Sequence, residues 1–223
     1  MSYYSTSGTV VSMLEPILGI NDPILTNSTY MATALQSSKD FIDNICDRDF
    51  LLHSDEVEFH DGNGRDSLNT YYYPIVGITY VVMYNQLMQS MRTFLDTELI
   101  IHPEWGEIFL PPIYPAFMAD KPFSAMFGNI FISGRRNIEI KYDYGYSTPP
   151  NEIVTASNLY ASSYILKLKF ASISGGSASR SIDGYSESFG AWKSSPFGSI
   201  GDSWEEQARQ IAYRWKRISM RAI

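Results

Sequence analysis

The chain has 223 residues, of which 44% are hydrophobic, so it is long enough to bury a core of its own. Its single cysteine excludes an internal disulfide framework and fits a reducing compartment. The net charge of −7 argues against ordinary DNA binding as the main activity.

Two helices are predicted in the first fifty residues. Apolar residues recur at helical spacing over 10–18, and Pro16 is expected near the start of this helix or at a break in it. A second helix is predicted to end at about Cys46, with Asn27 or Ser28 as its N-cap.

A change of hydrophobic period to two at Glu56 predicts a strand. The tetrad Asp61–Gly64 indicates a hairpin turn, because glycine and asparagine adopt the positive φ angles that a tight turn needs. We therefore expect a hairpin partner at Leu68–Tyr73 and a third strand at Ile78–Met83. A calcium loop is not expected at the turn, since Arg65 occupies a ligand position.

Residues 84–128 are predicted to form an extended, proline-containing insertion that is largely irregular. Short strands are possible within it at Leu95–Ile101 and Glu107–Leu110. Loops of this length usually carry a specific contact. The apolar residues near its end form either an exposed tip that meets a partner or a satellite core. They are Met118, Phe123, Met126 and Phe127.

The segment 137–170 joins the clearest strand to the longest helical pattern. Alternating apolar and polar residues over 137–143 predict a half-buried strand, which Gly145 ends. Pro149 suits the first position of a helix, where its missing N–H costs nothing. The apolar stripe over 153–170 predicts that this helix is largely buried.

The last fifty residues combine a loop with a terminal helix. Residues 172–202 are predicted to be a Gly/Ser-rich loop. Ser203 and Glu206 form a capping box that predicts an amphipathic helix over 203–223. This helix either packs on its own domain or docks onto a neighbouring molecule. The residues expected to dock are Trp204, Arg209, Ile211, Arg214, Trp215, Lys216, Arg217, Ile218 and Arg221.

No residue pattern indicates catalysis. The three histidines have no second ligand at a metal-binding spacing. Cys46 is followed by Asp47 and Asp49, which disfavour the thiolate that a nucleophile needs. No phosphate-binding glycine loop is present. We therefore expect no catalytic, cofactor-binding or metal-binding residue, and no enzyme.

Neither export nor membrane insertion is expected. The first ten residues lack the basic segment and the apolar core of a signal peptide. The longest uncharged run, 67–91, carries asparagine, glutamine, proline and three consecutive tyrosines, and so it reads as strands and a turn.

Charge is distributed unevenly along the chain. Residues 1–120 contain 16 acidic and 4 basic residues, a net charge of −12, whereas residues 121–223 contain 8 acidic and 13 basic residues, a net charge of +5. A polar molecule of this kind suits stacking against other proteins, including copies of itself. The alternative is that both charged regions are ordinary solvated surfaces.

Four motifs follow one another in a recognisable order. They are a helix end with arginine and an aromatic residue, a glycine turn before a strand that starts with proline, a strand followed by Gly-Tyr, proline and a helix, and a serine-rich loop. Their positions are Ile45–Phe50, Phe59–Val76, Asn137–Ala156 and Ser181–Ser186. In this order they resemble the head-tail connector (adaptor) proteins of tailed double-stranded DNA bacteriophages and prophages. Residues 84–128 and 192–223 lie outside the resemblance, and partner specificity is expected there.

The resemblance implies a fold and an assembly. The fold would be α+β and mainly helical, a small helical bundle packed against an antiparallel β-hairpin sheet, within a single connector domain over 1–223. Copies would form a ring, expected to have twelve members, beneath the portal protein of the virion. The ring would continue the DNA channel without binding DNA specifically and would give the tail or the next connector a docking surface. The helix 203–223 would reach the portal, and the insertion would face the tail or the lumen.

Two alternatives remain at this point. One is a tail-completion or neck protein that binds the tail tube instead of the portal. The other is a small cytosolic enzyme with a site that the sequence does not reveal. As a connector the chain would be made in the cytoplasm of the host bacterium, would act in the neck of the virion, and would need no cofactor and no membrane.

Overall fold

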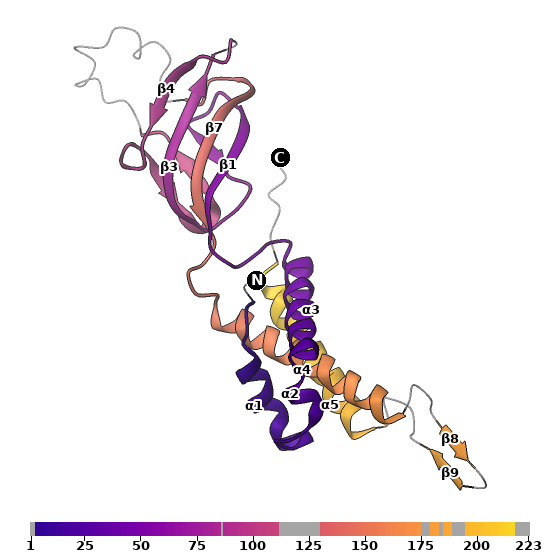
Figure 1. Cartoon of the computed structure of the whole chain (residues 1–223). Helices are drawn as coiled ribbons and strands as arrows, with labels where there is room; N and C mark the ends of the chain where they lie inside the picture. Colours follow the sequence, from indigo (N-terminus) through magenta and orange to yellow (C-terminus); the bar gives the residue numbers. More distant parts are fainter. Residues whose placement is uncertain are drawn as a thin grey trace. The chain divides into compact units, whose positions relative to one another are not determined.

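The computed structural model describes residues 3–85, 87–111, 130–174, 179–182, 185–188 and 195–216. The chain divides into two compact units (Figure 1). Met1–Phe50 and Pro149–Ile223 form a helical unit, and Leu51–Thr148 forms a β unit. The prediction of a mainly helical fold is therefore wrong, because the described residues of the β unit form seven strands in two antiparallel sheets. Three of them lie within the predicted insertion 84–128, and two of these three overlap the possible strands at Leu95–Ile101 and Glu107–Leu110.

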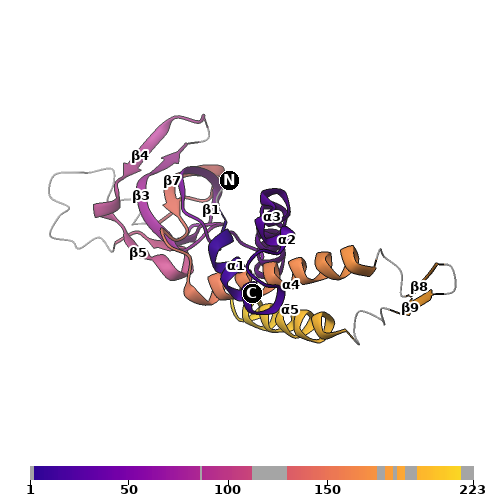
Figure 2. The same cartoon turned by 60° about the horizontal axis from the view of Figure 1, so that its bottom comes forward.

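The described residues of the helical unit form five helices. They are α1 (Ser7–Leu18), α2 (Pro23–Thr26), α3 (Ser28–Cys46), α4 (Asn151–Ser174) and α5 (Pro196–Arg214). The predicted second helix is confirmed as α3, whose N-cap side chain, Asn27, accepts hydrogen bonds from the N–H groups of Thr29 and Tyr30. Pro16 lies in the last turn of α1, not near its start. Figure 2 shows α4 and α5 side by side, and α3 and α1 also contact α4.

α4 runs through the centre of this unit, as the apolar stripe predicted. Ile153, Ile165 and Leu166 on α4 are fully buried. Val10 and Leu14 of α1 are fully buried as well and belong to the same core as the α4 residues Ile165 and Leu166. Ser157, Ser162 and Ser163 of α4 are also buried, and the hydroxyl of Ser157 bonds to those of Ser5 and Ser38.

α5 and the segment before it differ from the prediction. α5 begins at Pro196, with Ser195 as N-cap, so Ser203 lies inside the helix and does not cap it. Proline at the first position and a serine cap form a stronger start than the capping box seven residues later. Within the predicted Gly/Ser-rich loop, β8 (Ser179–Ile182) and β9 (Tyr185–Ser188) pair as an antiparallel hairpin.

The β unit contains a four-stranded and a three-stranded sheet. The first has the order β1 (His53–Gly62), β7 (Gly134–Tyr144), β3 (Ile75–Tyr84) and β4 (Ser90–Phe94). The second has the order β2 (Ser67–Asn69), β6 (Glu107–Phe109) and β5 (Ile100–His102). The predicted hairpin across Asp61–Gly64 is wrong, because β1 pairs with β7 while β2 pairs with β6.

β7 is the central strand predicted from the sequence alternation. Its apolar residues Ile138, Ile140 and Tyr142 are fully buried, and Asn137, also buried, bonds to the backbone of Gly62 and Ile132. The core of the unit also holds Phe94, Ile108 and Phe131. The β unit thus has a hydrophobic core of its own.

Candidate functional site

Most of the predicted docking helix packs against its own unit. Trp204 lies against the core formed by α1, α3 and α4, and Ala208 and Ala212 of α5 are fully buried. The guanidinium of Arg209 lies 5.3 Å from the ring centre of Phe41 and donates to Glu205. The apolar stripe of α5 therefore contributes to the stability of the helical unit.

Trp215 closes the end of α5. Its indole Nε1 donates to the Glu152 carboxylate, with 2.7 Å between the heavy atoms, and its ring meets Phe50 edge-on at 5.8 Å. The guanidinium of Arg48 lies 4.5 Å from the Phe50 ring centre and 5.7 Å from that of Trp215. Trp215 therefore links the end of α5 to the start of α4, through Glu152, and to the residues that follow α3, through Phe50 and Arg48.

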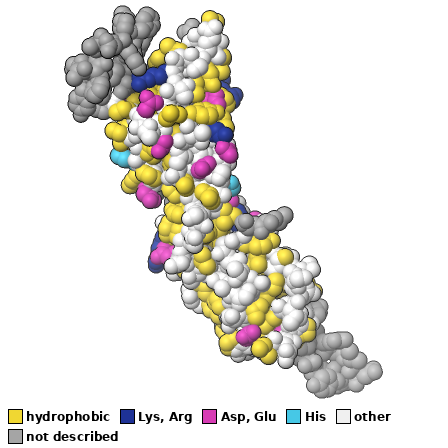
Figure 3. All heavy atoms as spheres, turned by 60° about the vertical axis from the view of Figure 1, so that its left-hand side comes forward, with side chains coloured by type: hydrophobic (Ala, Val, Ile, Leu, Met, Phe, Trp, Pro, Cys, Tyr) yellow, Lys and Arg dark blue, Asp and Glu magenta, His cyan; other side chains and the backbone are white. Residues whose placement is uncertain are grey.

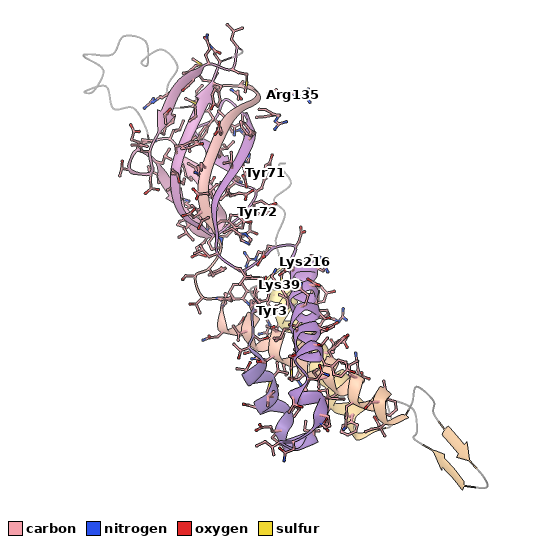
Figure 4. All side chains as sticks on the ribbon, viewed as in Figure 1. Tyr3, Lys39, Tyr71, Tyr72, Arg135 and Lys216 are labelled. Atoms are coloured by element: carbon pink, nitrogen blue, oxygen red, sulfur yellow. The ribbon has the colours of Figure 1, made fainter. Side chains whose placement is uncertain are left out.

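The side chains left exposed at this end of α5 are polar and basic. Tyr213 is 53% exposed, and Arg214 and Lys216 are exposed as well; Figure 4 labels Lys216. Among the described residues neither base forms an ion pair. The remaining predicted docking residues, Arg217, Ile218 and Arg221, lie outside the described residues, as do Met118, Phe123, Met126 and Phe127 of the predicted insertion.

Residues at and just after the end of α3 bind the N-terminal segment through hydrogen bonds to Tyr4. Tyr4 donates to the Asp43 carboxylate, and its hydroxyl accepts the N–H of Phe50 at 2.9 Å. Lys39 bridges Asp43 and Asp49, with Nζ–Oδ distances of 2.5 and 2.9 Å. Burial, followed by the hydrogen bond to Asp43, raises the pKa of Tyr4 far above its usual range, so the phenol stays protonated. The sequence pattern indicated the helix end but not this polar cluster, since Tyr4 is distant along the chain.

A buried polar network organises one side of the β unit. Glu58, only 4% exposed, accepts from the Tyr142 hydroxyl and from the N–H of Tyr71, and its other contact is His60 Nε2 at 2.7 Å. The Tyr142 hydroxyl also accepts the N–H of Tyr72. Burial, then the bond to Glu58, raises the pKa of Tyr142 far above its usual range. This network holds the segment after β2 against β1.

An open groove of about 700 Å³ lies over this network. It is lined by residues 56–61 of β1, by Tyr71 and Tyr72, and by Arg136. The ring of Tyr71 stacks on His60 with 4.3 Å between ring centres. Tyr71 and Tyr72 are 51% and 40% exposed and are labelled in Figure 4. The groove offers aromatic and carboxylate surface to a ligand.

Exposed apolar side chains also gather at the turn between β3 and β4. Leu87 is 77% exposed, Met88 58% and Met91 49%. The Asn85 side-chain oxygen accepts hydrogen bonds from the N–H groups of Leu87 and Gln89. Three exposed apolar side chains so close together in the sequence are typical of a surface that a partner covers.

The two units of the structure do not coincide with the acidic and basic parts of the sequence. The helical unit, made from both ends of the chain, contains 12 acidic and 11 basic residues, a net charge of −1, and the β unit contains 12 acidic and 6 basic residues, a net charge of −6. On the face drawn in Figure 3, acidic and basic side chains are interspersed with hydrophobic ones. The acidic excess therefore belongs to the β unit.

The described residues contain no cluster of histidine, cysteine and carboxylate side chains that would hold a metal ion. Cys46 is buried, and its thiol donates to the Ala212 carbonyl at 3.2 Å. Burial raises the pKa of this thiol to about 12, which keeps it protonated and poorly nucleophilic. In the same part of the chain, no helix is long and apolar enough to cross a membrane.

Comparison with known proteins gives a structural likeness but no family. No family model matches the chain, and no curated protein matches its sequence. A solved chain described as "Neck of empty GTA particle computed with C6 symmetry" is similar over 96% of this chain and 91% of that chain, with 13% identity and a TM-score of 0.43. Because the TM-score is below 0.5, no conclusion about fold or function follows from this likeness.

Proposed function

We propose that this chain is a structural protein of the neck of a phage-like particle, a head-tail connector whose copies form a ring beneath the portal. The observation that carries the proposal is the gathering of exposed apolar side chains at the β3–β4 turn and the start of β4, namely Leu87, Met88 and Met91. Such surfaces are costly in an isolated protein and are explained when an assembly covers them. The four sequence motifs that resemble those of connector proteins are the reason for proposing a connector ring as this assembly.

The charge of the β unit suits a channel for DNA. A ring that guides DNA must let the phosphate backbone slide, and acidic side chains do not hold phosphates. In the proposed ring, the acidic excess of the β unit lies toward the lumen. The β3–β4 turn, together with the segment that holds Met118 and Phe123, meets the tail or the next connector.

The portal is proposed to bind the exposed end of α5. Because Trp204 and Trp215 pack within the helical unit, the side chains available to a partner are Tyr213, Arg214 and Lys216. The two cations suit an acidic partner, and tyrosine and arginine are enriched at interface hot spots.

Charge reversal at the α5 end tests this docking. Arg214→Glu with Lys216→Glu should lower capture by purified portal at least about tenfold, which corresponds to about 1.4 kcal/mol of binding free energy. The melting temperature should stay nearly unchanged, because both side chains are exposed.

The matched control is Arg65→Glu with Arg135→Glu, the same charge change on exposed side chains of the β unit. Equal loss of capture in both double variants would show a general charge effect and contradict docking through α5. Capture of the unchanged chain by a purified tail tube, but not by the portal, would favour the tail-completion alternative.

A further inference from the structure

β1 is an edge strand of the four-stranded sheet. It stands first in the order of the four-stranded sheet and, within the described part of the chain, pairs only with β7. Six consecutive residues, Glu56 to Asp61, line the groove described above. Successive side chains of a strand point to opposite faces of the sheet, so a groove on one face would be lined by every second residue. A groove lined by six consecutive residues therefore runs along the edge of the strand. An exposed edge of this length is a template for another strand.

The two walls of the groove differ in chemistry. Glu56, Glu58 and His60 share one face of β1 with the rings of Tyr71 and Tyr72, and Glu58 and His60 are bonded to each other. Val57 and Phe59 share the other face, and Val57 is 43% exposed.

The charged groups at the ends of the groove are mostly acidic. Glu56 lies at one end, and at the other Asp61 accepts the backbone N–H of Arg136. The guanidinium of Arg136 lies 5.5 Å from the ring centre of Phe59. An added strand should therefore carry cations on the tyrosine side and apolar side chains on the Val57 side.

A segment of this chain has that pattern. In residues 217–222, Arg217, Ser219 and Arg221 alternate with Ile218, Met220 and Ala222. This period of two is typical of a strand with one apolar face. Six residues extend about 20 Å, at roughly 3.3 Å per residue, the same length as Glu56–Asp61 in β1. The described part of α5 ends before them, with Trp215 as its C-cap.

We propose that residues 217–222 of a second copy of this chain pair as an added strand with the outer edge of β1. The arginines then lie on the side of Glu56 and the tyrosine rings, where ion pairing and cation–π attraction stabilise them. Ile218 and Met220 cover Val57 and Phe59. Taking the strand from a neighbouring copy rests on the proposed ring, since a contact between two different surfaces of one chain is the kind that closes rings.

Disulfide trapping between two separate proteins tests the pairing. One protein carries Val57→Cys, the other carries Met220→Cys, and the mixture is oxidised and run on a non-reducing gel. The control replaces Val57→Cys by Val76→Cys, which is 58% exposed on β3 and does not line the groove. Because a seated strand raises the effective concentration of the thiols, the heterodimer should exceed the control by at least about tenfold. The native Cys46 is buried and should not interfere.

A second pair of variants tests the face and the charge. Ser219→Cys, on the polar face of the segment, should cross-link to Val57→Cys much less than Met220→Cys does. Arg217→Glu with Arg221→Glu in the Met220→Cys protein should lower the yield, and Glu56→Lys in its partner should restore it. Equal yields with Val57→Cys and Val76→Cys, or equal yields from positions 219 and 220, would overturn the pairing.

The pairing and the proposed function fail in different ways. Rings seen in particles without the cross-link would refute the added strand and leave the connector function intact. A specific cross-link in a chain that is absent from the particle would refute the connector function and leave the strand pairing intact.

Discussion

At the scale of single residues, Gly145 explains why the segment 137–170 turns where it does. It follows β7 with a φ of +98°, and a Cβ placed there would lie 2.0 Å from the Leu51 carbonyl oxygen. Its N–H donates to the Pro74 carbonyl at 2.9 Å. A residue without a Cβ is therefore required at this position for two independent reasons.

Gly145→Ala should destabilise the protein by at least about 2 kcal/mol, because the substitution combines an unfavourable φ with a clash against backbone. Gly77→Ala is the matched control, since nothing lies within 4 Å of the Cβ it would add to β3. Its effect should be small or stabilising, because alanine loses less entropy than glycine in a strand. Urea denaturation of both variants measures the difference, and equal stabilities would contradict the role given to Gly145.

At the scale of elements, an ion pair fastens the short helix α2 to α4. The Asp22 carboxylate caps α2 by accepting the N–H of Ile24 at 3.0 Å and bonds to Lys169 Nζ of α4 at 2.6 Å. Burial alone would raise the pKa of Asp22, but the bonds from Lys169 and Ile24 outweigh it and hold this pKa below its ordinary value of 3.8. Because the pKa is lower in the folded state, the charged pair stabilises the protein at pH values above 3.8. This stabilisation is lost as the pH falls through the pKa of the folded state.

Asp22→Asn should therefore lower the free energy of unfolding by about 1–3 kcal/mol at neutral pH, because asparagine keeps the cap but loses the charged hydrogen bond. The difference from the unchanged protein should shrink at pH 3 and below. Lys167→Gln, which removes a more exposed pair with Glu205, is the control and should cost less than about 1 kcal/mol. A difference for Asp22→Asn that is the same at pH 7 and pH 3 would contradict the assigned pKa direction.

Local signals predicted some elements well and missed others. The cap of α3, the apolar stripe of α4 and the alternation of β7 depend on neighbouring residues, and the structure confirms these elements. α4 begins at Asn151, however, and not at the predicted Pro149. The pairing of β1 with β7 joins residues about eighty positions apart, so the local turn signal at Asp61–Gly64 gave the wrong partner. The strands of the three-stranded sheet overlap the segments predicted at Leu68–Tyr73, Leu95–Ile101 and Glu107–Leu110. Their bounds differ from the prediction, because each strand has only three residues and so shows little of a period of two.

The site could be anticipated only in part. The basic residues at the end of α5 were visible in the sequence, and the exposure of Arg214 and Lys216 agrees with a surface role. The groove was not visible, because it needs the free edge of β1 together with Tyr71 and Tyr72, which the network around Glu58 brings together. A sequence signal for it existed in the acidic residues of β1, but these read equally well as a solvated strand face.

At the scale of the whole molecule, the chain combines a nearly neutral helical unit with an acidic β unit. In the proposed ring the two units have different roles. The helical unit supplies the portal-binding end of α5 and the segment that reaches the next copy. The β unit supplies the acidic surface for the DNA channel and the apolar β3–β4 turn.

Electron cryo-microscopy of the particle that contains this chain tests the connector proposal most directly. The expected result is a ring of copies beneath the portal, around the DNA channel, with the end of α5 against the portal and the β3–β4 turn covered by the tail or the next connector. Absence of the chain from purified particles, or its location away from the neck, would contradict the proposal.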